Sequence, residues 1–166
     1  MEQIIQLNSG AKLSPHFTLG ELTKTSHNVY NIPSHEAIEN LKRVCGWLEV
    51  LRERYSCITN AAEHRGRITN AAEHGVVINS GYRSPQLNKK VGGAVNSNHL
   101  TGCAVDIRVS GQEQLIIYAA ILIEYANETH QDFDELLLER NRHGAIWLHF
   151  AVRPKDNRRH VMFLRT

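Results

Sequence analysis

The sequence predicts an α+β fold with a mainly antiparallel sheet and helices packed on one side of it. Helical patterns come first along the chain, and short strand patterns follow, interrupted by one strongly apolar helix. Chains that segregate helices and strands in this order usually build α+β domains. The chain has 166 residues, of which 42% are hydrophobic and 22% charged, so it can bury one sizeable core. We therefore expect a single domain over residues 1–166.

The N-terminal part of the chain is predicted to be helical. Thr18 and Glu21 have the spacing of a capping box, in which two side chains close the start of a helix. A second helix is expected to begin after Pro33. Its apolar residues recur at helical spacing and form one stripe, which we expect to pack on a sheet. The residues of this stripe are Ile38, Leu41, Val44, Cys45, Leu48 and Leu51.

A direct repeat follows the second helix. The segment ITNAAEH occurs at 58–64 and again, unchanged, at 68–74. A solenoid would need a longer period and at least three copies, so we interpret 58–74 as a local duplicated insertion. Each copy ends in a Glu-His pair that could be taken for a metal motif. We favour the alternative, a solvated loop or an extra helical turn.

Strand patterns fill most of the remaining chain. The run Val76 to Ile78 precedes a Gly-Tyr-Arg-Ser-Pro turn, and residues 104–109 alternate in polarity, which places Asp106 opposite the apolar face. An apolar helix is predicted over 111–127. Two or three further short strands are expected in the stretches 133–139, 145–152 and 160–164.

Composition argues against several classes of protein. The formal net charge is only +2, and no basic run is interleaved with aromatic residues, so we expect no nucleic-acid binding. No apolar stretch is long enough to cross a membrane, and the N-terminus lacks the pattern of a secretory signal. The three cysteines, Cys45, Cys57 and Cys103, show no C-x-x-C spacing. We expect each to be a small buried apolar side chain rather than part of a disulfide or zinc knot.

Alternation along the strands directs three possible metal ligands toward one cleft. Asp106 points away from the predicted core, and His99 lies in the turn before its strand. In residues 145–152 the same rule places Trp147 and His149 on one face. Two imidazoles and a carboxylate are a typical ligand set for catalytic zinc, which leaves the fourth position for water. The alternative is that both histidines are ordinary turn and sheet residues with satisfied hydrogen bonds.

The stretch SNHLTGCAVD, residues 97–106, fills every fixed position of the pattern S-x-H-x-x-G-x-A-x-D. In this it resembles the zinc D-alanyl-D-alanine carboxypeptidases and their relatives, the vancomycin-resistance D,D-dipeptidases and bacteriophage L-alanyl-D-glutamate endopeptidases. WLH at 147–149 is similar to the third-ligand strand of that family, and INSGYRSPQLN at 78–88 to its arginine-bearing segment. The N-terminal LSPHFTLGEL and the helix after it are similar to a compact subgroup common in phages and prophages.

The resemblance implies a Hedgehog-like zinc peptidase fold acting on peptidoglycan stem peptides. His99, Asp106 and His149 would bind Zn²⁺, and a zinc-activated water would attack the scissile carbonyl. Arg83 would stabilise the resulting oxyanion. The protein, expected to be monomeric and synthesised in the cytoplasm, would reach the cell wall after holin-type or lytic release.

Substrate contacts are assigned less directly. Ser97 would lie beside the metal and bond a ligand or the substrate, with a simple turn-forming serine as the alternative. Trp147 shares a face with His149 and could form a wall of the substrate cleft, although it could equally serve packing. Tyr82, next to Arg83, carries the same two alternatives. His143 and His160 are expected to be exposed loop residues.

The general base departs from the family pattern. Several relatives carry an acidic residue three positions before the last histidine, and here that position holds Ile146. Glu139 is the best replacement, because a turn after it could bring it back across from the strand of His149. A plain strand-end carboxylate is the alternative. Without any base the protein would be a zinc-containing module that binds peptidoglycan or protein and does not hydrolyse it.

Overall fold

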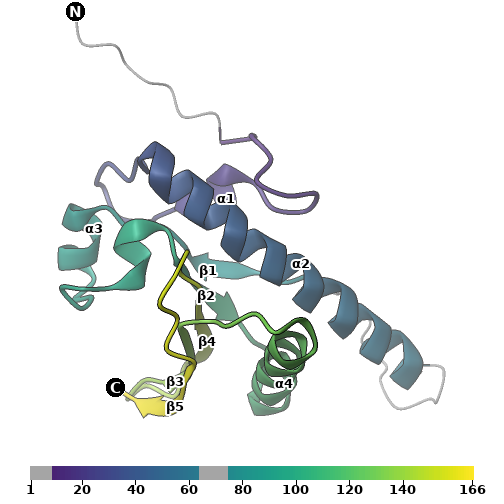
Figure 1. Cartoon of the computed structure of the whole chain (residues 1–166). Coiled ribbons are helices and arrows are strands. Elements are labelled where there is room, and N and C mark those ends of the chain that lie inside the picture. The colour runs from purple at the N-terminus through teal and green to yellow at the C-terminus, as the bar shows by residue number, and fades with distance from the viewer. Residues whose placement is uncertain (1–8, 64–74) are drawn as a thin grey trace, which may run out of the picture.

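The computed structural model describes residues 9–63 and 75–166 (Figure 1). The helices in these ranges are α1 (Leu19–Thr23), α2 (His35–Glu63), α3 (Pro85–Lys90), the 3-10 helix η1 (Asn98–Thr101) and α4 (Gln112–Thr129). The strands are β1 (Ile78–Ser80), β2 (Ala104–Arg108), β3 (Glu135–Arg140), β4 (Ile146–Ala151) and β5 (His160–Arg165). The expected α+β class is confirmed.

The strands form one sheet in the order β1-β2-β4-β3-β5. The pairs β1–β2, β2–β4 and β3–β4 are antiparallel, and the edge strand β5 runs parallel to β3. The predicted β1 is shifted, because Val76 and Val77 precede the strand and a register irregularity separates Ile78 from Ser80. The Arg108 amide still donates to the Val77 carbonyl, so this segment lies along β2.

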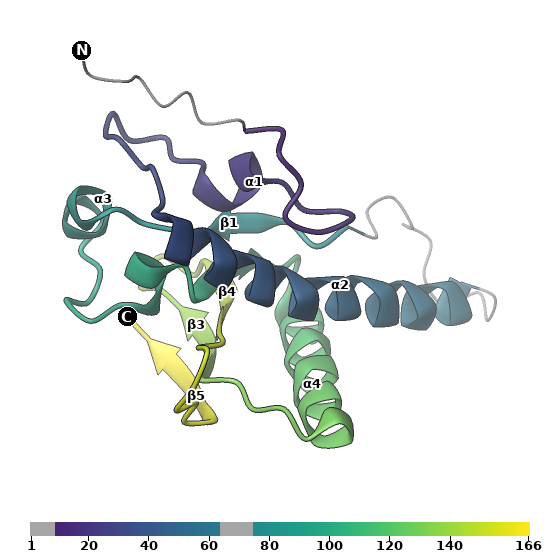
Figure 2. The ribbon, with the colours of Figure 1, turned by 45° about the horizontal axis from the view of Figure 1, so that its top comes forward.

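Helices α2 and α4 cover one face of the sheet. Figure 2 shows α2 crossing the molecule, with α4 running down from it beside the strands. The predicted apolar stripe of α2 lies in the core, where most of its residues are fully buried and Ile38 is partly buried. Trp47 of α2 makes edge contacts with Tyr125 of α4 and tilted contact with Phe150 of β4. The opposite face of the sheet carries Asp106 of β2, His149 of β4 and Glu135 of β3.

The N-terminal segment supports the loop after β1, which carries Arg83. The predicted capping box is present: the Thr18 hydroxyl accepts from the Glu21 amide, and the Glu21 carboxylate accepts from the Thr18 amide. After α1, the Asn31 side-chain amide donates to the carbonyls of Thr23 and Tyr82. These bonds tie α1 and the loop after it to the chain just after β1.

The duplicated insertion is only partly described. The first copy of the repeat continues α2 through Glu63, which agrees with an extra helical turn, and the second copy, 68–74, lies outside the described residues. All three cysteines are free thiols. Cys45 and Cys103 are buried as expected, but the expectation for Cys57 was wrong, because Cys57 faces solvent on the C-terminal part of α2.

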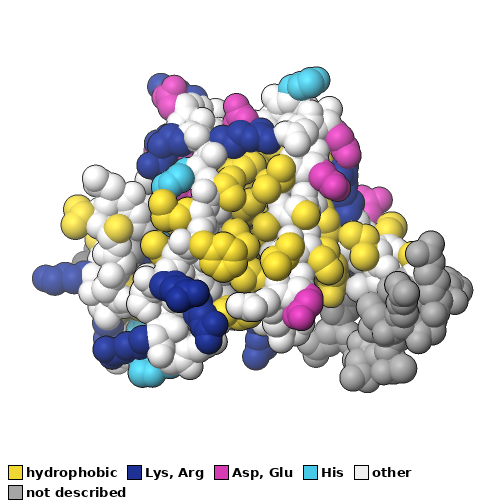
Figure 3. Space-filling model, turned by 90° about the horizontal axis from the view of Figure 1, so that it is seen from below, with side chains coloured by type: hydrophobic (Ala, Val, Ile, Leu, Met, Phe, Trp, Pro, Cys, Tyr) yellow, Lys and Arg dark blue, Asp and Glu magenta, His cyan; other side chains and the backbone are white. Residues whose placement is uncertain are grey.

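Part of the apolar surface remains uncovered near the edge of the sheet. Figure 3 shows hydrophobic side chains gathered on the face seen from below. Val161 and Phe163 of β5 are 47% and 64% exposed, since α4 packs against β3 and β4 and leaves the edge strand open. Among the described helices, none combines the length and apolar character needed to cross a membrane.

Candidate metal centre

His99, Asp106 and His149 come together on the face of the sheet opposite α2 and α4. Asp106 of β2 and His149 of β4 are direct partners in the antiparallel ladder, and η1 supplies His99. The Asp106 Oδ1 atom lies 3.3 Å from His99 Nε2 and 3.0 Å from His149 Nδ1. The three ligand atoms all lie within 4.8 Å of one another. The convergence predicted from strand alternation is confirmed.

The turn of η1 determines where His99 lies. Ser97 caps this turn, and its hydroxyl accepts a hydrogen bond of 3.3 Å from the His99 amide. Gly102 ends the turn in the left-handed region at φ 73°, and its amide donates to the His99 carbonyl. A Cβ added at Gly102 would lie 2.4 Å from the Ala37 carbonyl oxygen of α2. Ser97 therefore has a turn-forming role, and a contact with substrate stays a prediction.

The His99 ring is oriented by a backbone carbonyl. Its Nδ1 atom lies 2.6 Å from the Gly81 oxygen, which can only accept, so Nδ1 carries the proton and Nε2 presents a lone pair. Burial lowers the pKa of His99, and the nearby charges of Arg83 and His149 lower it further, whereas Asp106 opposes them. The neutral imidazole is the form that binds a metal.

Arg83 holds the other oxygen of Asp106. Its Nη2 atom lies 2.5 Å from Asp106 Oδ2, and its Nε donates to the Ser80 hydroxyl. Burial raises the pKa of Asp106, but the charges and hydrogen bonds of His99 and His149 outweigh this and hold the pKa well below the usual range. Asp106 is therefore ionised, with Oδ1 facing both histidines.

His149 has a hydrogen-bond partner at each ring nitrogen. Nδ1 faces Asp106, and Nε2 lies 3.1 Å from Glu135 Oε2. Burial lowers the pKa of His149, but the hydrogen bonds to Asp106 and Glu135 outweigh it and raise the pKa to about 9. A metal ion at Nδ1 would take the place of the proton there, while the other proton would stay on Nε2 and be donated to Glu135.

The donor set fits zinc. Two imidazole nitrogens and one carboxylate oxygen are ligands that zinc accepts, and a three-residue set leaves a coordination position for water or substrate. His99, Asp106 and His149 are 2%, 9% and 7% exposed, so the ligands are shielded from bulk water. This arrangement is typical of a catalytic centre, since structural zinc sites have four protein ligands.

Glu139 lies on the same face as the ligands. It is the ladder partner of Trp147, so it lies across from the strand of His149 as expected, and β3 and β4 form the expected hairpin. Burial raises the pKa of Glu139, and the nearby charge of His149 lowers it in part. Within the described residues, no hydrogen bond to its carboxylate is found. The role of Glu139 as general base stays a prediction. Ile146 points to the face of the sheet opposite His149.

The remaining predicted residues are placed differently. Tyr82 is only 8% exposed and packs in the hydrophobic core, which gives its ring a structural function whatever it contributes to binding. Trp147 is half-buried on the face of His149, so it is placed where a cleft wall would be. His143 and His160 are exposed, as expected, although His160 begins β5 rather than lying in a loop.

Some residues near the metal ligands were not predicted from the sequence, and they make hydrogen bonds that connect to the ligand His149 through Glu135. Asn98 and Arg158 both donate to the neighbouring carboxylates of Asp134 and Glu135. Glu135 could have been found, because it precedes Glu139 by two strand periods and so faces the same way. Arg158 carries no signal in the sequence, since it lies in the loop before β5.

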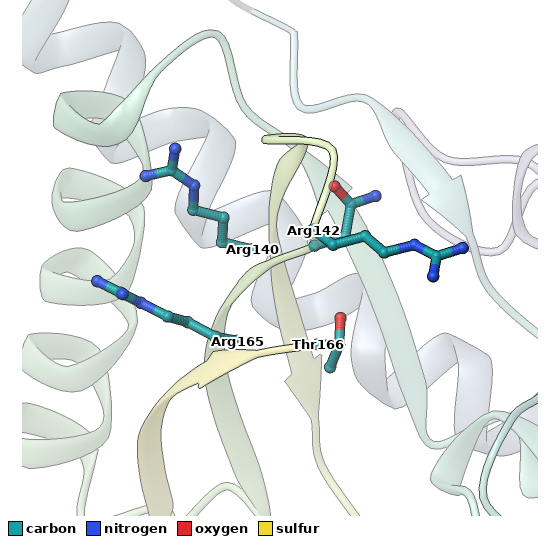
Figure 4. Close-up of a pocket in the computed structure, with 5 residues that line it drawn as sticks. Arg140, Arg142, Arg165 and Thr166 are labelled. Atoms are coloured by element: carbon teal, nitrogen blue, oxygen red, sulfur yellow. The ribbon is translucent and has the colours of Figure 1, made fainter.

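A group of arginines forms a separate hollow at the ends of β3 and β5. It is lined by Arg140, Asn141, Arg142, Arg165 and Thr166. Figure 4 shows Arg140 and Arg165 extending toward a helix on one side, while Arg142 extends the opposite way. The guanidinium groups therefore do not converge on one point, and none of the predicted site residues lines this hollow.

The structure is thus an α+β fold with a His-Asp-His cluster that could hold a metal ion. Residues 15–143 match the profile of the family described as peptidase M15, a region that spans more than half of the chain. The chain belongs to the peptidase M15 family, whose members are zinc peptidases. The matched region contains His99, Asp106 and Glu139 and ends before His149. No curated protein matches the chain.

Proposed function

We propose that the protein is a zinc metallopeptidase that hydrolyses peptidoglycan stem peptides. The activity would be of the D-alanyl-D-alanine carboxypeptidase or the L-alanyl-D-glutamate endopeptidase type. The observation that carries the proposal is the convergence of His99, Asp106 and His149 in a chain of the M15 family. The stem peptide is proposed from the likeness of the segment 97–106 to the zinc signature of those enzymes.

Zinc bound by these ligands would polarise the scissile carbonyl and make a water molecule acidic enough to react near neutral pH. Arg83 would then stabilise the negative charge that develops on the carbonyl oxygen. Of its five N–H donors, hydrogen bonds within the protein use those directed at Ser80 and Asp106, which leaves others for substrate. Donors aimed at a developing oxyanion are commonly among the largest catalytic contributions.

Glu139 would move the proton. It would accept a proton from the attacking water and deliver it to the leaving amine. A general base works best when its pKa lies near the working pH, and the raised pKa of Glu139 is a shift in that direction. Its carboxylate is not engaged elsewhere among the described residues, in contrast to Glu135, which has several partners. These observations support Glu139 as the replacement for an acid at Ile146.

Digestion of purified peptidoglycan tests the proposal. The zinc-loaded protein would be incubated with intact sacculi and the released fragments identified by mass spectrometry, beside a sample stripped with a chelator and then reloaded. We expect shortened stem peptides, loss of their release on chelation, and recovery with zinc. The mass of the fragments identifies the bond. Zinc bound without any fragment release would contradict the proposal.

A binding module is the second candidate function. The apolar Ile146 at the position where several relatives carry an acid favours it. Such a module would retain zinc and bind peptidoglycan without cleaving it. Sedimentation of the protein with sacculi, measured beside the digestion, separates the two candidates: binding without products supports the module, and products support the peptidase. We propose the cell wall as the place of action in either case, after holin-type or lytic release.

A further inference from the structure

We propose that Glu135 is a positioning residue for the metal ligand His149, and that Asn98 and Arg158 hold Glu135 in that position. The inference rests on the proposed metal centre. It adds a residue that neither the zinc signature nor the family pattern identifies, and it gives the two glutamates of β3 different functions.

The contact geometry defines what Glu135 does to the ring. Its Oε2 atom lies 3.1 Å from His149 Nε2, while Nδ1 of the same ring lies 3.0 Å from Asp106. A carboxylate only accepts hydrogen bonds, so Nε2 must donate to Glu135. With the proton kept on Nε2, the lone pair of Nδ1 is available for a metal, and contacts at both nitrogens fix the rotation of the ring.

Asn98 connects Glu135 with the turn of the first ligand. Its side-chain amide donates to Glu135 Oε2 at 2.9 Å and to Asp134 Oδ2 at 2.8 Å. Asn98 directly precedes His99 in η1, and Glu135 begins β3. A single amide group therefore links the segment that carries the first ligand to the strand that orients the third one. The distance between the two imidazoles is set in part by this link.

Arg158 occupies the other side of Glu135. Its Nη2 atom donates to Glu135 Oε1 at 2.8 Å and to Asp134 Oδ2 at 2.7 Å. Both oxygens of Glu135 are thus engaged, and the guanidinium compensates the charge of this half-buried carboxylate beside His149. A carboxylate held from both sides is suited to orient a neighbour and is poorly suited to carry protons, which leaves the proton transfer to Glu139.

The affinity for zinc tests this inference. Competition with a chromophoric chelator would be measured for the wild type, Glu135→Ala and Glu135→Gln, with Glu124→Gln as a surface control on α4. Loss of a carboxylate that orients a histidine ligand typically weakens metal binding by about 10–100-fold. We expect a loss of that size for Glu135→Ala and a smaller one for Glu135→Gln, whose side-chain oxygen can still accept from Nε2. The control should bind zinc as the wild type does.

A second measurement separates positioning from a merely structural role. With zinc on Nδ1, the proton of His149 is on Nε2 in every variant, and the chemical shift of this Nε2–H proton reports its hydrogen bond to Glu135. The Glu135→Gln protein, which keeps the size of the side chain, is the sample if Glu135→Ala does not fold. This proton should resonate downfield in the wild type, as expected for a hydrogen bond to a carboxylate, and move upfield in the variant. If both variants bound zinc with the affinity of the wild type and kept its Nε2–H chemical shift, this inference alone would be overturned. Absence of zinc from the wild type would overturn the metal centre as well.

Discussion

Glu135 and Glu139 lie on the same face of β3, yet their surroundings give them opposite properties. The hydrogen bond to His149 and further bonds from Asn98 and Arg158 oppose the effect of burial and lower the pKa of Glu135 to about 2. Burial raises the pKa of Glu139. The first is thus a permanently charged acceptor, and the second is a carboxylate that can exchange a proton.

Glu139→Gln is predicted to retain zinc and lose most of the activity. Removal of a general base typically costs a factor of about 10²–10⁴ in rate, whereas the ligands stay intact. Release of stem-peptide fragments over time, measured at equal zinc content, gives the ratio. Glu124→Gln on the solvent side of α4 is the matched control and should digest at the wild-type rate. Full activity of Glu139→Gln would exclude Glu139 as the base.

The turn of η1 is the element on which the first ligand depends. Gly102 combines a positive φ with close approach to the carbonyl of Ala37, so a side chain there is disfavoured twice. We predict that Gly102→Ala lowers the free energy of unfolding by at least about 1–2 kcal/mol, the usual cost of left-handed backbone in a residue with a Cβ. Chemical denaturation measures the loss, and a displaced His99 should weaken zinc binding in parallel.

Gly46→Ala is the control for this substitution. Gly46 lies within α2, and a Cβ there meets nothing within 4 Å. Alanine in a helix interior is favoured over glycine by about 0.5–1 kcal/mol, so this variant should be as stable as wild type or slightly more so. Equal effects of the two substitutions would mean that the turn of η1 imposes no special constraint.

Among the helices and strands, periodicity predicted the long helices and the regular strands, together with the face on which their residues lie. Alternation placed Asp106 and His149 on one face, and the expected hairpin placed Glu139 across from the strand of His149. Both predictions agree with the structure because β2, β4 and β3 are regular and paired in register. The short helices α3 and η1 were not predicted, since each depends on a serine cap and tertiary contacts rather than on its own periodicity. The exposure of Cys57 depends on how far α2 extends past the sheet, which local pattern does not encode.

At the scale of the whole molecule, the polar support of the metal centre joins segments far apart in the sequence. Asp134 is fully buried and accepts from Asn98 of η1 and from both the backbone and side chain of Arg158. These contacts link residues separated by 24 to 36 positions. The sequence carries no sign of them, because side-chain pairing across loops follows from the finished fold, whereas the apolar stripe of α2 could be predicted from periodicity.

Asp134 is predicted to make stability depend on pH in the acid range. Burial raises its pKa, but hydrogen bonds from Arg158 and Asn98 lower it to about 2, below the 3.8 of an ordinary aspartate. A lowered pKa stabilises the fold above pH 3.8, and this stabilisation is lost as pH falls toward 2. The shift corresponds to about 2 kcal/mol. Urea unfolding of wild type and Asp134→Asn across this range should show their difference shrinking as pH decreases; a constant difference would contradict the assignment.

The zinc content of the purified protein shows whether His99, Asp106 and His149 bind one zinc ion. Elemental analysis after loading and desalting should give one zinc per chain for the wild type and for His143→Ala and His160→Ala, whose rings are exposed. Substitution of His99 or His149 by alanine should remove the bound zinc. Wild-type protein without zinc, or full zinc content in both ligand variants, would contradict zinc binding by His99, Asp106 and His149.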